Sequence, residues 1–193
     1  MSYVVSRLQV INNVLAELGE SSVAIEDASA NSTFIKERIN ALLPYVLSKG
    51  NFRFNLVYRE DSTPAAQPLS GQYQYTFTLP SDYGRMYRML NRTQYEEIQG
   101  GLATDSQTIQ YYYNTNGAPF FDGNFEGMSP PFVEALTFYV VSRVAAPLTE
   151  NLELKKIALE SFNAYIADAI LMNEYEINKL ISPPNEYDRV VYS

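Results

Sequence analysis

The sequence predicts an α+β protein, in which a helical bundle of about four helices carries an inserted, antiparallel β-rich subdomain. Apolar residues recur at helical spacing near both ends of the chain and alternate every second residue in its middle. The 193 residues suffice for one core with a sizeable insertion. Helices and strands that are segregated along the chain are typical of the α+β class.

Two helices are expected before residue 52. The apolar stripe of the first comprises Val4, Leu8, Ile11, Leu15 and Leu18. Gly19 follows this helix where a left-handed cap belongs. The second helix is expected from about Thr33 to Lys49, ends at Gly50 and contains Pro44, which predicts a kink.

Strands are expected from Phe52 onward. Phe52, Phe54, Leu56 and Tyr58 alternate, and so do Tyr73, Tyr75, Phe77 and Leu79. The segment "PSDYG" then predicts a turn, "RMYRML" another strand, and two more short strands are expected around Gly100-Gly101. In-phase alternation predicts that Phe52, Phe54, Tyr75 and Phe77 anchor the sheet to the helical part.

Helices return at Ser129, a typical N-cap residue followed by two prolines that suit a first helical turn. This third helix is expected to end at Pro147. A fourth is expected from near Thr149 to about Ile181. Its predicted apolar face comprises Leu152, Leu159, Phe162, Ile166 and Ile170. The resulting division is a helical body at 1–51 and 129–182, a β-rich subdomain at 52–128 and a C-terminal arm at 183–193.

Composition excludes several kinds of active site. The chain has no histidine and no cysteine, so a Ser–His–Asp triad and thiolate metal sites are impossible. We find no phosphate-binding loop, dinucleotide fingerprint or metal motif, so no catalytic residue, metal or cofactor is expected. Glu96 and Glu97 are adjacent in an expected strand and point to opposite faces, which makes them a poor catalytic pair.

Charge and hydropathy indicate what the chain does not bind. The net charge of −8 argues against a nucleic-acid-binding face, because phosphate contact needs clustered Lys and Arg. No apolar run approaches the roughly 20 residues that span a membrane, and no signal peptide is recognisable at the start. We therefore expect no membrane partner.

The 16 tyrosines are the most informative feature. Tyr111, Tyr112 and Tyr113 are consecutive, so their rings point to both faces of a strand. Three interpretations remain open: a contact surface for another protein, a two-sided core or plain exposure, and a platform for sugar stacking. Beyond Pro183-Pro184, four residues suited to strands predict a docking arm for a neighbouring protein. They are Tyr187, Val190, Val191 and Tyr192.

Several segments, in order, resemble tail tubular protein A, the gatekeeper-type head-to-tail adaptor family of short-tailed bacteriophages. The segments are "VINNVLAELGESSVAIED", "INALLPYVLSKGNFRFN", "YTFTLPSDYGRM" and "PPFVEALTFYVVSRVAAPLT". They cover nearly the whole chain. Family members commonly have Trp before the first strand, where this chain has Phe52, and Pro44 interrupts the second helix.

The resemblance implies a structural subunit of the virion tail, with no enzymatic activity. About twelve copies would form a ring between the portal protein and the tail nozzle protein, with a channel through which genomic DNA passes without specific binding. The arm would dock on the portal or a neighbouring subunit. Candidates for subunit or nozzle contact are Tyr111, Tyr112, Tyr113, Phe120 and Phe121. The alternative function is a tail-associated glycan hydrolase or a glycan-binding module.

Overall fold

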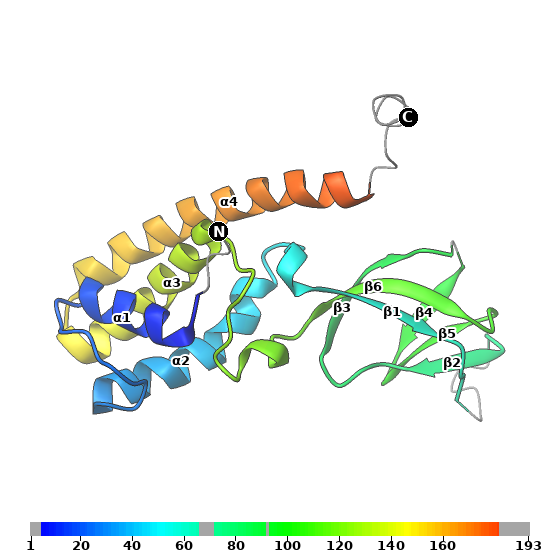
Figure 1. Cartoon of the computed structure of the whole chain (residues 1–193), viewed down its shortest axis with the longest axis horizontal. Coiled ribbons are helices and arrows are strands. Elements are labelled where there is room, and N and C mark those ends of the chain that lie inside the picture. The colour runs from blue at the N-terminus through cyan, green and yellow to red at the C-terminus, as the bar shows by residue number, and fades with distance from the viewer. Residues whose placement is uncertain (1–4, 66–71, 92, 182–193) are drawn as a thin grey trace, which may run out of the picture. The chain divides into compact units, whose positions relative to one another are not determined.

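The computed structural model describes residues 5–65, 72–91 and 93–181, with side chains up to residue 175. It has four helices and two small antiparallel sheets, which confirms the predicted α+β class (Figure 1). The chain divides into two compact units, a helical unit of Met1–Phe54 with Phe120–Ser193 and a sheet unit of Asn55–Pro119. The sheet unit is therefore shorter at both ends than the 52–128 expected from the sequence.

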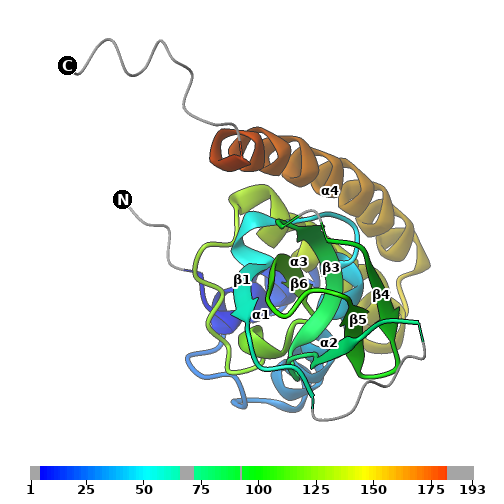
Figure 2. The ribbon, with the colours of Figure 1, turned by 90° about the vertical axis from the view of Figure 1, so that its right-hand side faces the viewer.

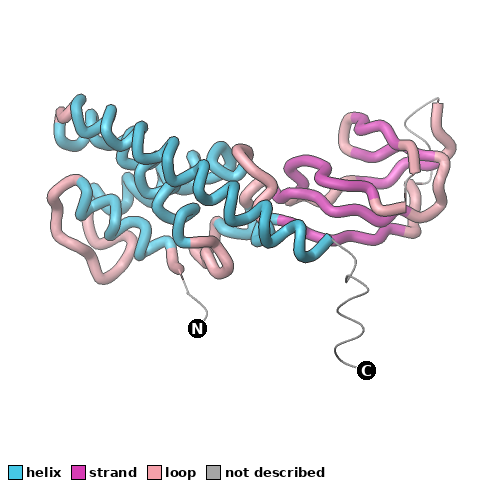
Figure 3. The backbone as a smooth tube through the Cα atoms, turned by 90° about the horizontal axis from the view of Figure 1, so that it is seen from above, coloured by secondary structure: helices cyan, strands magenta, loops and turns pink. Residues whose placement is uncertain are grey.

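The helical unit contains α1 (Arg7–Glu17), α2 (Ala30–Leu47), α3 (Pro130–Thr149) and α4 (Leu152–Ile181). Helix α3 contacts each of the other three helices, so it lies at the centre of this unit. Figure 3 distinguishes these helices, in cyan, from the strands of the other unit, in magenta. Two short 3₁₀ turns, Arg53–Asn55 and Ala118–Phe120, occupy the points where the chain passes between the units.

Local sequence signals explain where the first two helices begin and end. Ser6 caps α1 by accepting a hydrogen bond from the Gln9 N–H, and Ser29 and Ser32 form a capping box at the start of α2. Gly19 follows α1 with φ of 77°, the left-handed conformation that the sequence predicts for it.

The predicted end of the third helix at Pro147 is wrong. Helix α3 continues to Thr149, and Glu150 closes it in the left-handed conformation with φ of 56°. A proline in the last turn lacks only its own N–H, so two further residues can keep helical geometry after it.

Helix α3 is long and apolar enough to cross a membrane, judged by length and composition alone. Most of it is buried within the helical unit, including Phe132, Leu136 and Val140. A central core helix has the same composition because it packs on several sides. We attribute the apolarity of α3 to this packing.

The predicted apolar face of α4 is partly wrong. Phe162 and Ile166 are buried, but Leu152 is 70% exposed and Leu159 is 41% exposed. The buried face instead follows Ala158, Phe162, Ile166 and Ala169, whose spacing of three and four residues matches one side of a helix.

The sheet unit consists of two three-stranded antiparallel sheets (Figures 1 and 2). Its strands are β1 (Leu56–Asp61), β2 (Tyr75–Thr78), β3 (Tyr83–Met89), β4 (Tyr95–Ile98), β5 (Gly101–Thr104) and β6 (Ile109–Thr115). The sheets have the orders β1-β6-β3 and β2-β5-β4. Five buried residues form their shared core: Phe77, Leu102, Ile109, Tyr111 and Tyr113.

The prediction that Phe52, Phe54, Tyr75 and Phe77 jointly anchor the sheet to the helices is wrong. The first strand begins at Leu56, and the rings of Phe52 and Phe54 pack on Phe132, with centroids 4.7 and 4.8 Å away. Phe77 belongs to the separate core of the sheet unit, and Tyr75 packs against that core. The two pairs thus stabilise two different cores.

Hydrogen bonds between Asn55 and Thr115 hold together the two ends of the sheet unit. The Asn55 side chain, which is buried, donates to the Thr115 carbonyl at 3.2 Å and accepts from the Thr115 hydroxyl. Gly117 donates its N–H to the same hydroxyl at 3.3 Å. The Asn55 side-chain amide and the Thr115 hydroxyl thereby gain partners away from water.

Candidate functional site

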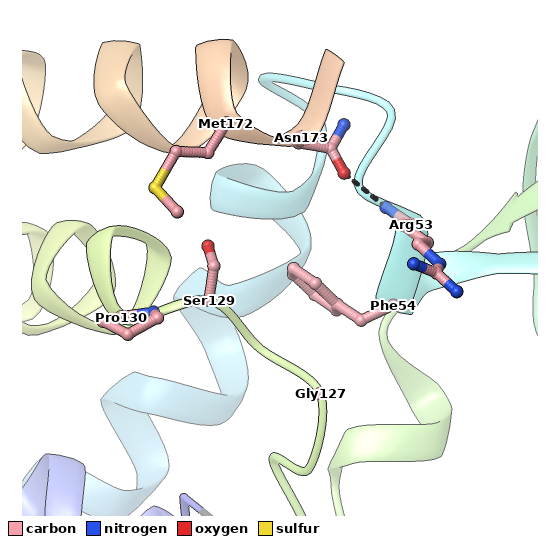
Figure 4. A pocket seen from close by; sticks show the side chains of 7 residues that line it. All are labelled: Arg53, Phe54, Gly127, Ser129, Pro130, Met172 and Asn173. Carbon is pink, nitrogen blue, oxygen red and sulfur yellow. Dashed lines mark hydrogen bonds between the residues drawn. The ribbon is translucent and has the colours of Figure 1, made fainter. Parts of the chain in front are cut away.

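A pocket of about 410 Å³ lies in the helical unit, between the Arg53–Asn55 turn, the segment before α3 and the C-terminal half of α4 (Figure 4). Its lining residues are Arg53, Phe54, Gly127, Ser129, Pro130, Met172 and Asn173. Phe54, Pro130 and Met172 give it an apolar wall. The volume suits one side chain or a small ligand rather than an extended polymer.

Asn173 fixes the wall formed by Arg53 and Phe54. Its Oδ1 accepts a hydrogen bond from the Arg53 N–H at 2.6 Å, and its Nδ2 donates to the Asn51 carbonyl at 2.7 Å. The Asn173 side chain is almost fully buried, so both bonds are made away from water. The side-chain amide of Asn173 therefore holds the segment from Asn51 to Arg53 against α4.

Ser129 contributes a hydroxyl that lacks a partner. It is the N-cap residue of α3, as the sequence predicts, but its side chain makes no capping hydrogen bond. Pro131 stands where an N–H would otherwise be available for capping, and it has none. The Ser129 oxygen is buried and has no hydrogen-bond partner among the described residues. Figure 4 shows it pointing toward α4, beneath Met172 and beside the Phe54 ring.

Arg53 supplies a positive charge at the rim of the pocket. Figure 4 shows its guanidinium beyond Phe54 rather than between Met172 and Ser129. The residue is exposed and pairs with no acidic side chain within 5–65, 72–91 and 93–175. The pocket therefore combines an apolar interior, one unsatisfied hydroxyl and one cation at its edge. This arrangement suits binding of an apolar group with acidic neighbours.

The structure places three of the predicted contact residues inside cores. Tyr111 and Tyr113 are buried in the sheet unit, and Phe120 is buried in the helical unit. The prediction that these three rings form a contact surface is therefore corrected. The reason is that β6 is the central strand of its sheet, and its odd-numbered tyrosines point to the covered face.

Burial also explains the ionisation of these tyrosines. Removal from water raises the pKa of Tyr113 to about 12, and the Asp82 carboxylate, which accepts its phenol hydrogen bond at 3.0 Å, adds to the effect. Burial raises the pKa of Tyr111 and Tyr83 well above 10 as well. These phenols are core groups that stay protonated at neutral pH.

Tyr112 and Phe121 remain predicted contact residues. Tyr112 is half-buried beside Tyr58, with ring centroids 5.5 Å apart, and Phe121 is 42% exposed. The other predicted positions, Tyr187, Val190, Val191 and Tyr192, lie outside the described residues.

Acidic residues do not gather into a metal or catalytic cluster in the part of the chain that the structure describes. No group of three or more His, Cys, Asp or Glu side chains is placed there to hold a metal ion. Glu96 and Glu97 both lie in β4 and are exposed. Sequence reasoning did not find the pocket, because Arg53, Ser129 and Met172 are far apart in the chain. The unusual Ser129-Pro130-Pro131 sequence was its one local signal.

A second surface feature is a set of exposed apolar residues on α4. Seven of the large hydrophobic residues that are exposed lie on this helix: Leu152, Ile157, Leu159, Tyr165, Leu171, Met172 and Tyr175. Ile157 and Leu171 are 50% and 65% exposed, and Tyr175 is 66% exposed. A concentration of this kind on one helix is more than the scattered exposure that any protein surface shows.

In comparisons with known proteins, no protein-family model matches the chain, and no curated protein matches it significantly.

Proposed function

We propose that this chain is the structural subunit of a ring-shaped head-to-tail adaptor of a short-tailed bacteriophage. The ring joins the portal protein to the tail nozzle protein in the virion tail and leaves a channel for the genome. The observation that carries the proposal is the exposed apolar side of α4, and the resemblance of the sequence to tail tubular protein A supports it. In this proposal the four helices form the bundle that is the adaptor body.

The exposed residues of α4 have the spacing of a helix–helix contact. Ile157, Ala164 and Leu171 recur every seven residues and are all exposed, so they lie along one side of the helix. They span about 21 Å at 1.5 Å per residue. This side is turned away from the residues that pack on α3, so α4 can contact its own unit and a neighbouring subunit at once.

A ring requires a contact that repeats head to tail. Such heterologous interfaces close into rings when the rotation between copies permits. A single helical stripe buries less than the roughly 800 Å² per partner of a standard interface. We therefore expect closure to depend on the portal, which would hold adjacent copies side by side.

The acidic charge of the chain suits a channel. Twelve copies at −8 each carry a formal charge of −96. A lumen of net negative potential repels DNA phosphates, so the genome would pass without adhering. The same charge also favours solubility of the free subunit.

The test uses charge substitutions on α4. The full chain is co-expressed with the portal protein of the same phage, and the co-purified complex is measured. Leu171→Glu and Ile157→Glu should abolish ring formation while the subunit stays folded by circular dichroism. Asn163→Glu places the same charge on another exposed side of α4 and should leave the ring intact. Rings of normal mass with Leu171→Glu and Ile157→Glu would contradict the proposed contact.

A further inference from the structure

The pocket has the features that would recognise a tyrosine between acidic residues. Its apolar wall offers the Phe54 ring and the Met172 thioether, which pack well against an aromatic ring. The Ser129 hydroxyl is buried at the wall of the pocket without a partner, and a phenol hydroxyl would satisfy it once the Ser129 side chain turns toward the pocket. Arg53 at the rim favours carboxylates on either side of the inserted residue.

One segment of the chain itself matches this chemistry. Tyr187 stands between Glu186 and Asp188 in "NEYDRVVYS", a segment outside the described residues. From Asn173, α4 continues eight residues to Ile181, which is about 12 Å. The six residues from there to Tyr187 span up to about 20 Å when extended. The prolines at 183 and 184 favour leaving the helical path, so Tyr187 can reach back to the pocket of its own chain.

We propose that residues 185–192 dock on the helical unit of their own chain, with the Tyr187 side chain in the pocket between Phe54, Ser129 and Met172. Attachment to the same chain raises the effective concentration of the segment to the millimolar range, so a modest contact suffices. Arg53 would then lie near Glu186 or Asp188, two side chains of opposite charge. The inference stands apart from the proposed ring, because it concerns the single subunit.

The absence of tryptophan from the chain makes a clean reporter possible. In full-length protein, Tyr187→Trp introduces the only indole, whose emission moves to shorter wavelength when it leaves water. We expect emission at clearly shorter wavelength than that of the same variant in denaturant, unchanged on dilution. Adding Met172→Lys should shift it back toward the denatured value. Leu171→Lys is the matched control, since Leu171 is the next residue, is exposed and does not line the pocket.

A second measurement covers the case in which an indole is too large for the site. The chain has no cysteine, so paired substitutions can report proximity by disulfide formation. Met172→Cys with Arg189→Cys, which keeps the Tyr187 ring, should oxidise quickly within one chain, and Arg53→Glu should slow the reaction at least several-fold. Leu152→Cys with Arg189→Cys is the control, because Leu152 is exposed at the other end of α4.

Three results would overturn the inference. The first is equal oxidation rates for the 172–189 and 152–189 pairs. The second is crosslinking only between chains, which would assign the segment to a neighbouring copy. The third is an indole emission that Met172→Lys and Leu171→Lys change equally. Because Leu171→Glu tests the ring and Met172→Lys tests the pocket, failure of one proposal is distinguishable from failure of the other.

Discussion

Arg7 shows how one side chain organises the start of the helical unit. It is 6% exposed and donates to Glu26 at 2.7 Å, to Asn40 at 3.1 Å and to the Phe121 carbonyl at 2.7 Å. These bonds join α1, the loop before α2, α2 itself and the segment after the sheet unit. The guanidinium fork provides donors in several directions at once, which a lysine cannot do.

We predict that Arg7→Met destabilises the protein by about 3 kcal/mol, because it leaves Glu26 and the Phe121 carbonyl without their donor. This loss lies at the low end of the range for breaking a buried ion pair, because the Glu26 side chain is still 23% exposed. Urea unfolding measures the change. Lys36→Met removes the partner of the exposed Asp27 and a more distant partner of Glu26, at 3.7 Å, and should have a much smaller effect. Equal losses for the two variants would show that Arg7 acts as an ordinary surface charge.

The buried tyrosines give the sheet unit a dependence on high pH. Their pKa values are raised in the folded state, to about 12 for Tyr113, whereas in the unfolded chain they return to about 10. Above pH 10 the unfolded state loses protons that the folded state keeps, so stability falls as pH rises from 10 toward 12. Absorbance of ionised tyrosine should therefore show a late-titrating group that Tyr113→Phe diminishes. Titration of all tyrosines near pH 10 without unfolding would contradict the burial.

At the level of elements, strand β3 depends on a close backbone approach to the end of β6. A Cβ on Gly84, in β3, would lie 2.8 Å from the Thr115 carbonyl oxygen at the end of β6. Backbone cannot yield as a flexible side chain can. Gly84→Ala should therefore destabilise the sheet unit by on the order of 1–3 kcal/mol. Thermal unfolding followed by circular dichroism tests this, and an unchanged midpoint would show that β3 shifts without cost.

Sequence patterns predicted these elements well where one local rule decides. Ile11 and Leu15 on the buried face of α1, the serine at the start of α3 and the turn before β3 followed from spacing and turn chemistry. Val10 and Val14 on the same face of α1 were not predicted. The exposure of residues on α4 did not, because Leu152 and Leu159 look like core residues until the position of α3 is known. The sequence did not predict the pocket for the same reason, because only tertiary packing brings Met172 close to Ser129.

At the level of the whole molecule, two cores replace the single anchored core that the sequence suggested. Phe52 belongs to the helical core and Phe77 to the sheet core, although both stand in alternating aromatic patterns. Alternation fixes which side chains share a face, but it does not say which core that face covers. The β-rich part therefore begins at Asn55 rather than at residue 52, and it ends at Pro119 rather than at residue 128.

We predict that substitutions in the two cores act on different units. Phe52→Ala and Phe77→Ala should each cost about 3–5 kcal/mol, because both rings are fully buried. Hydrogen exchange should then increase in 55–119 for Phe77→Ala and in the four helices for Phe52→Ala. Uniform acceleration over the whole chain by either variant would indicate one cooperative unit.

The central claim is that copies of this chain assemble into a ring on a portal. Light scattering of the full-length protein, alone and mixed with the portal protein of the same phage, tests it most directly. Each copy has a mass of 21.9 kDa, so we predict that the portal complex gains the mass of about twelve copies. A mixture in which the portal gains no mass at micromolar concentrations would contradict the account.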